Sequence, residues 1–552
     1  MALGAVECDG RTMSKFQSNG LWPSHLLGTI TSTSVIHSYP ETAKYVRNQL
    51  RPYSAFSIVQ IALRRLNTGD HEDIHHLQTW PWLTCLIVKL ALEDDSIPFD
   101  GEECPERVFN RCLNALWEAQ AGRDRLRPDQ NIWLQLRAML PAQLAFQNLP
   151  AWDFLRYPAL IDRLKADHPL RMQFVEKFGM QPHEFMCISY AILAGVFNGK
   201  KYLDSTYYAQ LTNHFGGAVT RVFDEFSCGL VGLREKLISE KLHRQATGEL
   251  VRPEHEYNEA PWLQRYPLLR TGHTKFIIWH PAVFARGFQT AVHRRMSING
   301  AEYSGLFSQV FEDYVLELLK DSGTDFFGEK DYKKLVGRDK KAVEAIISED
   351  GVNIFIESKL TVYSEIVNVS GEQARVWTGV KRLYEAMRQG WAVSSILQKE
   401  VHDKGKWSQA TENYLLIVTS QPMGCASGEQ FRRWFGRDVF DAERVHNARQ
   451  TVPSPAQLKL LPPEHIVIAS IDEYEHLMSA VKRGELHLPT MFREIAKQIV
   501  EPKTSFMYLE QFLGREYAGA RGSPVVLSAL DAMHKTLAKC FDVDSSFFQK
   551  EK

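Results

Sequence analysis

The sequence EAIISEDGVNIFIESK, residues 344–359, contains two short apolar runs joined by Asp350-Gly351. Asp-Gly between runs of this kind predicts a β-hairpin, because a type I′ turn requires positive φ at both central residues. Each step back along one strand then matches a step forward along the other, which pairs Glu344 with Glu357. The sequence therefore predicts a hairpin with two carboxylates opposite each other at its open end.

The open end of this hairpin is predicted to carry two acids and one lysine. Lys359 follows Glu357 by two residues, so both side chains point to the same face of the strand. Opposed carboxylates destabilise a sheet unless a positive charge lies between them. A hard divalent cation binds through one or two carboxylates, and a lysine beside it can orient or deprotonate water. The pattern predicts Mg²⁺ or Mn²⁺ at Glu344 and Glu357; a solvated edge strand with alternating Glu and Lys is the open alternative.

These residues also resemble a known family. Glu344, followed after the hairpin by Glu357-Ser358-Lys359, resembles the core of the PD-(D/E)xK nuclease superfamily, which has the restriction-endonuclease-like fold. The resemblance covers about residues 302–475. It implies that the two glutamates are metal ligands and that both of them and the lysine are catalytic. Two positions depart from the family pattern: glutamate replaces the usual first aspartate, and Val343 replaces the usual proline.

The resemblance implies two further catalytic residues on the helices that flank the hairpin. Glu312 lies beside the apolar stripe of a helix predicted over residues 302–320, and an inward-facing acid requires a partner. That partner is either a metal ion, as the resemblance implies, or an arginine of the core. Gln373 is the glutamine of the following helix, which is predicted to continue to Gln389 and to end at Gly390. Residues 370–373 also have the form of a capping box, which leaves a purely structural role for Gln373 open.

Basic residues near the hairpin are candidate contacts to a phosphate backbone. Residues 329–341 carry six basic and three acidic side chains immediately before Glu344. Phosphate contacts of this kind are independent of base sequence and sensitive to salt. A solvated edge is the open alternative. The predicted nucleic-acid-binding residues are Lys333, Lys334, Arg338, Lys340, Lys341, Arg375 and Lys381.

Composition and charge restrict the class of protein. The chain has 552 residues, of which 44% are hydrophobic and 24% charged, and this length predicts about two to four globular domains. Its net charge of −1 means that a nucleic-acid enzyme would need a locally concentrated basic surface. None of the 8 cysteines forms a C-x-x-C pair, which predicts reduced thiols. Without a long apolar run or a secretory signal, we expect a cytoplasmic protein that has no membrane partner.

Four segments follow from the pattern of apolar residues. Residues 1–40 are rich in Gly, Ser and Thr and predict an irregular lead-in. Residues 41–300 have apolar residues at three- and four-residue spacing and predict a mainly α-helical domain of unknown role, with one of its helices over residues 218–243. Residues 301–485 combine the hairpin, helices and two further β-rich runs at residues 413–420 and 465–470, which predicts an α/β domain, restriction-endonuclease-like by resemblance, with a mixed sheet flanked by helices. Residues 486–552 predict a C-terminal helical extension.

The resemblance implies a Mg²⁺-dependent endonuclease that hydrolyses phosphodiester bonds. DNA is the preferred substrate over RNA because the superfamily is mostly DNA-directed, and cutting two strands favours a homodimer or higher oligomer. Fusion to a large helical domain suggests antiviral defence against foreign DNA, which is an analogy at the level of fold. Two alternatives stay open: a catalytically inactive nuclease-fold protein that acts as a nucleic-acid-binding or assembly module, and a helical protein-interaction scaffold.

Overall fold

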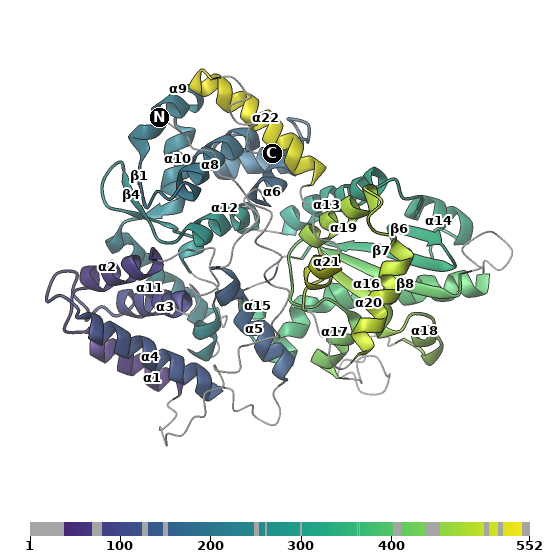
Figure 1. The fold of residues 1–552 in the computed structure, drawn as a ribbon, viewed down its shortest axis with the longest axis horizontal. Coiled ribbons are helices and arrows are strands. Elements are labelled where there is room, and N and C mark those ends of the chain that lie inside the picture. Colours follow the sequence, from purple (N-terminus) through teal and green to yellow (C-terminus); the bar gives the residue numbers. More distant parts are fainter. Residues whose placement is uncertain are drawn as a thin grey trace.

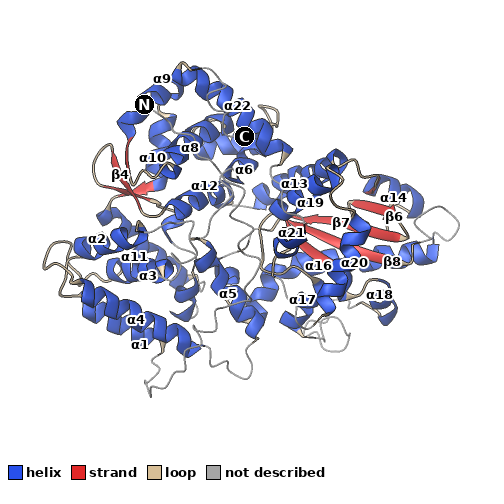
Figure 2. Ribbon diagram, viewed as in Figure 1, coloured by secondary structure: helices blue, strands red, loops and turns tan. Residues whose placement is uncertain are grey.

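The structure is a computed structural model in which helices predominate and two small sheets lie among them (Figures 1 and 2). The predicted lead-in over residues 1–40 lies outside the described residues except for its last three. The structure describes residues 38–68, 80–123, 131–146, 153–247, 253–259, 262–297, 301–361, 363, 365–400, 410–436, 453–501, 507–516 and 523–543.

Helices make up most of the first half of the chain, as the apolar spacing predicts. Many begin at residues that favour a helix start. For example, the Ser54 side chain accepts a hydrogen bond of 3.0 Å from the Ser57 amide at the start of α2. The α-helices of this half are α1 (Tyr39–Leu50), α2 (Ala55–Leu66), α3 (Pro81–Leu92), α4 (Glu106–Arg123), α5 (Ile132–Leu144), α6 (Arg156–Asp162), α7 (Pro169–Phe178), α8 (Pro182–Phe197), α9 (Ala209–Phe215), α10 (Ala218–Phe226), α11 (Leu230–Ala246) and α12 (Pro281–Met296).

A small sheet in this half was not predicted. Its strands lie in the order β1-β4-β3-β2. The prediction of one helix over residues 218–243 is wrong, because β2 interrupts it to pair in parallel with β3. Such short strands carry almost no periodic signal, so their pairing is decided by contacts between distant segments. The four strands are β1 (Tyr202–Asp204), β2 (Ser227–Cys228), β3 (Leu268–Arg270) and β4 (Lys275–Ile278).

The second sheet contains the predicted hairpin. The strand order is β5-β6-β7-β8-β9, antiparallel from β5 to β7 and parallel from β7 to β9, so the sheet is mixed as predicted. The β-rich runs predicted at residues 413–420 and 465–470 form its last two strands. The five strands are β5 (Phe327–Gly328), β6 (Ala345–Glu349), β7 (Val352–Lys359), β8 (Glu412–Thr419) and β9 (Ile466–Ser470).

The hairpin has the predicted register. Ala345 pairs with Ile356, and Glu349 pairs with Val352. Asp350 has φ 48° and Gly351 has φ 73°, which are the positive values that the two central residues of a type I′ turn need. The turn residues therefore fix which side chains meet at the other end of the hairpin.

Helices cover both faces of this sheet (Figure 1). On one face, Ile354 and Ile356 belong to a core that includes residues of α13 (Ala301–Asp321), α19 (Ile471–Lys482) and α20 (Leu488–Val500). On the other face, Phe355 packs in a core with α16 (Gln373–Glu400) and α17 (Gly428–Phe435). The alternation of side chains along β7 divides its residues between these two cores. An α/β region with a covered sheet therefore follows the helical half of the chain.

The helix after the hairpin is longer than predicted. Gly390 was expected to end it, but α16 continues for ten more residues to Glu400. A Cβ at Gly390 would lie 2.9 Å from Leu415 Cδ2 and 3.0 Å from Leu461 Cδ2. The absence of a side chain at Gly390 lets α16 pack closely on β8. Gly390 therefore serves helix–sheet packing and does not end the helix.

The C-terminal residues divide between the two halves of the molecule. Phe492 of α20 contacts Tyr414 of β8 at 5.4 Å between ring centroids, so α20 belongs to the second sheet. The last helix, α22 (Pro524–Phe541), packs against α6, α8 and α9 and lies beside them in Figure 1. One hydrophobic core joins α22, the helices from α6 to α10, α12 and one face of the second sheet. The predicted C-terminal extension is therefore not a separate layer.

Two further observations concern the described residues as a whole. None of their helices has the length and apolar character needed to span a bilayer. Their cysteines are free thiols, and all except Cys540 are buried.

Candidate active site

The open end of the hairpin brings Glu344, Glu357 and Lys359 together. Glu344 lies directly before β6, and its amide donates to the Ile356 carbonyl at 3.1 Å. Glu357 and Lys359 lie at the C-terminal end of β7 and form an ion pair. Both carboxylates are buried, whereas the Lys359 side chain is 19% exposed. The site therefore consists of two acids that are shielded from solvent and one lysine that solvent partly reaches.

Burial and mutual repulsion act on both acids. The pKa of Glu344 rises to about 8, first because burial disfavours its charged form and second because Glu357 lies close by. Burial also raises the pKa of Glu357, which the positive charge of Lys359 opposes. Two carboxylates and one ammonium leave a deficit of positive charge, which a bound cation would remove.

A hydrogen bond from Ser358 holds the Glu344 carboxylate. Ser358 Oγ donates at 2.7 Å to Glu344 Oε1. Ser358 lies between Glu357 and Lys359 on β7, so this contact ties Glu344 to the strand that carries the other two residues of the site.

Glu312 lies on α13 and takes part in the electrostatics of the site. It is half-buried, and its pKa rises because of burial and the neighbouring charge of Glu329, whereas Lys359 lowers it. Glu312 in turn raises the pKa of both Glu344 and Glu357. The helix before the hairpin therefore supplies a third carboxylate near the predicted pair.

The glutamine at the site is Gln389, which was not predicted. Its side chain lies close enough to Glu357 to lower the pKa of that carboxyl, and its Nε2 donates to the Ala342 carbonyl at 3.2 Å. Gln373 instead donates to the Trp434 carbonyl at 2.7 Å in the first turn of α16. Sixteen residues separate the two glutamines, about 24 Å along a helix. The structure therefore does not bring Gln373 to the end of the hairpin where Glu344, Glu357 and Lys359 meet.

A signal for Gln389 was present in the sequence but was not specific. It follows the buried Ala386 by three residues, at the flank of the apolar stripe of α16. With a helix end predicted at Gly390, Gln389 would be a terminal residue and not one inside the helix. Only the packing of α16 on the sheet shows that its side chain reaches Glu357.

The predicted phosphate-binding residues divide into two groups. Lys333 and Lys334 lie on α14 (Glu329–Val336), where they pair with Glu329 and Asp331. Arg338, Lys340 and Lys341 lie in the following loop, with Lys340 half-buried and the other two exposed. Arg375 pairs with Glu372 on α16, and Lys381 is exposed on the same helix.

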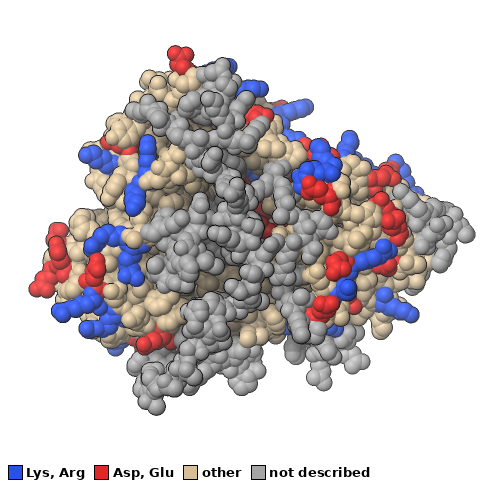
Figure 3. Space-filling model, in the orientation of Figure 1, with Lys and Arg blue, Asp and Glu red and all other residues tan. Residues whose placement is uncertain are grey.

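The first of these groups lies next to the site. The Glu329 amide at the start of α14 donates to the Glu344 carbonyl at 3.0 Å. In the second group, Lys381 is eight residues from Gln389, about 12 Å along α16. Figure 3 shows lysine and arginine interspersed with acidic residues on the face in view, with no large field of one sign.

The oxygen donors at the site meet the needs of a hydrated divalent cation in part. Glu344 Oε2 is buried and has no hydrogen-bond partner among the described residues. The described residues contain no preassembled group of three or more His, Cys, Asp or Glu ligands. Mg²⁺ needs only one or two carboxylates because it keeps several waters. Glu344 and Glu357, with Glu312 nearby, therefore fit a hydrated hard cation but not a fully protein-bound ion.

The chain matches no protein-family model, no curated protein and no solved structure. Its likeness to the PD-(D/E)xK nucleases consequently rests on the residues and contacts described above.

Proposed function

We propose that this chain is a metal-dependent nuclease whose active site is the open end of the β6–β7 hairpin. The observation that carries the proposal is the coupled pair of buried acids, Glu344 and Glu357, beside Lys359. Burying two interacting carboxylates is costly for stability, and such costs concentrate at functional sites. The unpartnered Glu344 Oε2 adds a free cation ligand at the same place.

The residues have distinct roles in this proposal. Glu344 and Glu357 would hold Mg²⁺ or Mn²⁺, and Glu312 would bind it directly or through water. When bound, the ion would polarise the phosphodiester and neutralise charge on the leaving oxygen. Lys359 orients or activates the attacking water and stabilises negative charge on the phosphoryl oxygens. Gln389 is a positioning residue that fixes the Glu357 carboxylate relative to the loop at Ala342.

DNA is the proposed substrate, with RNA as the second choice. The support is the basic segment that contains Lys333 and Lys334 on α14 and the exposed Arg338 and Lys341 after it. These residues directly precede Glu344 in the chain and would contact phosphates without reading bases. Defence against foreign DNA and a dimeric assembly remain part of the proposal by resemblance alone.

A cleavage assay tests the proposal. Wild type, Lys359→Ala and Glu357→Ala would be incubated with supercoiled plasmid, linear duplex, single-stranded DNA and RNA in Mg²⁺, Mn²⁺ or EDTA. We expect wild type to cut only with metal, and both variants to lose roughly 100-fold or more of the rate. Lys482→Ala is the matched control, since Lys482 also pairs with a carboxylate, Asp321, but on the exposed surface of α19.

Two results would contradict the proposal of a nuclease with its active site at the hairpin end. One is cleavage that survives in both variants, which would place the chemistry elsewhere or in a contaminant. The other is a wild type that neither cuts nor binds Mn²⁺. Salt-sensitive DNA binding without cleavage, unchanged in Lys359→Ala, would establish the inactive nucleic-acid-binding alternative instead.

A further inference from the structure

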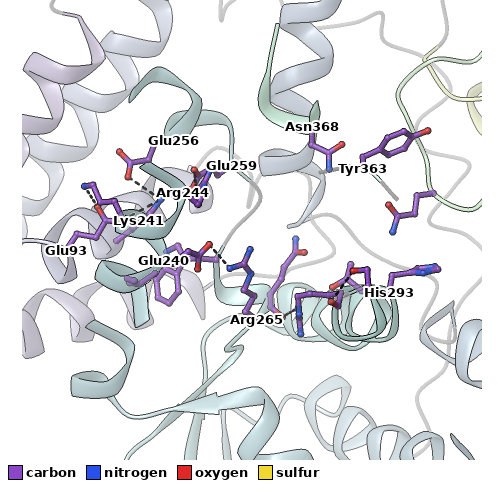
Figure 4. Close-up of a pocket in the computed structure, with 18 residues that line it drawn as sticks. Glu93, Glu240, Lys241, Arg244, Glu256, Glu259, Arg265, His293, Tyr363 and Asn368 are labelled. Carbon is purple, nitrogen blue, oxygen red and sulfur yellow. Dashed lines mark hydrogen bonds and ion pairs between the residues drawn. The ribbon is translucent and has the colours of Figure 1, made fainter. Parts of the chain in front are cut away.

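A cavity of about 300 Å³ lies where the helical half meets the α/β region. Its lining comes mainly from α3, α11, α12 and the segment between β2 and β3. Tyr363, Asn368 and Gln421 of the α/β region complete it (Figure 4). This volume is at the lower end of the range for small-molecule sites. The cavity is distinct from the candidate active site, because none of the acids proposed there lines it.

Most charges that line this cavity neutralise one another. Lys89 is buried between Glu259 at 2.6 Å and Glu256 at 3.2 Å. Lys241 pairs with Glu93 at 2.6 Å. Figure 4 shows Glu93, Lys241, Glu256 and Glu259 on one side of the cavity. Further pairs among the lining residues are Lys89 with Glu93, Arg244 with Glu259 and Arg265 with Glu240.

Arg294 on α12 is the exception among the lining cations. Within the described residues it has no carboxylate in ion-pair range, and its Nη1 donates only to the Gln264 carbonyl, at 3.2 Å. Burial, followed by the nearby positive charge of Arg265, lowers the pKa of Arg294 to about 10. His293 also lines the cavity, but burial lowers its pKa to about 3, so it stays neutral.

An arginine in this position requires an explanation. A largely buried charge without a counter-ion is costly, and folded chains normally pair it or bind something of opposite sign. A guanidinium has five donors and binds carboxylate or phosphate oxygens in pairs. Arg294 uses one of its nitrogens on Gln264 and borders the second guanidinium of Arg265. The wall around it also offers the amides of Asn368 and Gln421.

We propose that this cavity binds a small anion that carries a phosphate or carboxylate group, with Arg294 as its principal ligand. The anion would supply the missing negative charge between Arg294 and Arg265. Asn368 and Gln421 would hydrogen-bond to its polar groups, so the ligand would contact both halves of the molecule.

The cavity is linked to the candidate active site through the ends of two strands. Tyr363 follows Lys359 by four residues, and Gln421 follows the end of β8 by two. Hydrogen bonds of 3.0 Å tie Thr361 to Ser420, from the Thr361 amide to Ser420 Oγ and from Ser420 Oγ to the Thr361 carbonyl. A ligand that pulls on Gln421 would therefore act on the segment that holds Lys359. This regulatory part rests on the proposed nuclease function, whereas the anion site does not.

Calorimetric titration with inorganic phosphate, pyrophosphate, AMP and citrate tests the anion site on the full chain. We expect wild type to bind at least one of the four probes. Arg294→Gln keeps a donor for the Gln264 carbonyl and should bind that probe about tenfold or more weakly, as loss of a charge-assisted pair predicts. The probes separate phosphate from carboxylate chemistry and inorganic from nucleotide sources.

A matched control and a stability measurement exclude a general effect of charge or folding. Arg107→Gln removes the same charge from the exposed surface of α4 and should bind as wild type does. Without ligand, Arg294→Gln should melt no lower than wild type, because it removes an uncompensated charge. The bound probe should raise the melting temperatures of wild type and Arg107→Gln equally, and that of Arg294→Gln by less. Equal affinity in wild type and Arg294→Gln, or no binding of any probe at millimolar concentration, overturns the site.

Cleavage rates measured with and without the bound probe test the regulatory part. A change in wild type that is absent in Arg294→Gln supports coupling through Gln421 and residues 360–363. An unchanged rate with saturating probe overturns coupling while leaving the anion site in place. If anions bind but no condition yields cleavage, the proposed nuclease fails and the anion site stands.

Discussion

At the scale of single residues, Glu344 lies where the fold disfavours the charged form of its carboxyl group. Its carboxyl group is buried and lies near the carboxylate of Glu357. One of its oxygens, Oε1, accepts a hydrogen bond from Ser358. The other oxygen, Oε2, has no hydrogen-bond partner in the described part of the chain. A residue chosen for stability alone would not carry a charge in this position.

The raised pKa of Glu344 predicts how stability without metal depends on pH. The folded chain keeps a proton up to about pH 8, whereas an unfolded chain releases it near 4.5. Between these values the folded state binds more protons, so stability falls as pH rises. We expect EDTA-treated wild type to lose a few degrees of melting temperature from about pH 6 to pH 8, and Glu344→Gln to lose less.

Metal and a control substitution complete this prediction. Mn²⁺ or Mg²⁺ should restore the melting temperature of wild type at pH 8 but not that of Glu344→Gln, because the ligand must be deprotonated to bind. Glu349→Gln, on the exposed end of the same strand, should keep the pH dependence of wild type. An identical pH dependence in Glu344→Gln and wild type would show that Glu344 is not the titrating group.

At the scale of elements, α16 connects the site to the sheet through a close contact. Gly390 lies where this helix crosses β8, and Leu415 and Leu461 are both fully buried beneath it. Gln389, the adjacent residue, reaches Glu357. The depth at which α16 sits on the sheet therefore sets the position of a residue of the active site.

Two helix glycines test this contact against each other. In Gly390→Ala the added methyl group would compress against the two leucines, which typically costs about 1–3 kcal/mol. Gly305→Ala on α13 meets open space and should gain roughly 0.5–1 kcal/mol from helix propensity. Urea unfolding should rank Gly390→Ala below Gly305→Ala by at least about 1 kcal/mol. The reverse order would mean that α16 can move away from β8 without loss.

At the scale of the whole molecule, a buried ion cluster holds the two halves together. Arg156 of α6 binds Glu475 of α19 at 2.7 Å, Asp153 at 3.0 Å and also Asp472. The Glu475 carboxylate accepts a further hydrogen bond from Tyr314 of α13. One arginine faces three acids, and burial together with Asp472 raises the pKa of Asp153 to about 7.

Removing this arginine should destabilise the junction strongly. Arg156→Met leaves three carboxylates uncompensated, and breaking a buried ion pair in this way costs about 3–5 kcal/mol. Arg163→Met is the matched control, since Arg163 forms an exposed pair with Glu317 at 2.7 Å worth less than about 1 kcal/mol. The deficit of Arg156→Met, measured by urea unfolding, should shrink as pH falls because protonation removes the unpaired charges. Equal losses in both variants would show that the cluster does not carry the junction.

Local patterns were sufficient for much of the fold. The Asp350-Gly351 turn fixes the hairpin register through backbone geometry that few other residue pairs adopt. Apolar spacing placed the helix predicted over residues 302–320 within one residue of each end of α13. Both features depend on residues within a few positions of one another, which is why they can be recognised without knowledge of the rest of the chain.

The sequence by itself also determined which charged residues meet at the end of the hairpin, because strand pairing follows from the turn. Only the tertiary structure decided that Gln389 and not Gln373 reaches Glu357, that β2 divides α10 from α11, and that Arg294 lines a cavity with no carboxylate in ion-pair range among the described residues. Each of these depends on how segments far apart in the chain pack against each other. Such contacts leave no periodic trace in sequence, since their free energy arises only once the distant surfaces are brought together.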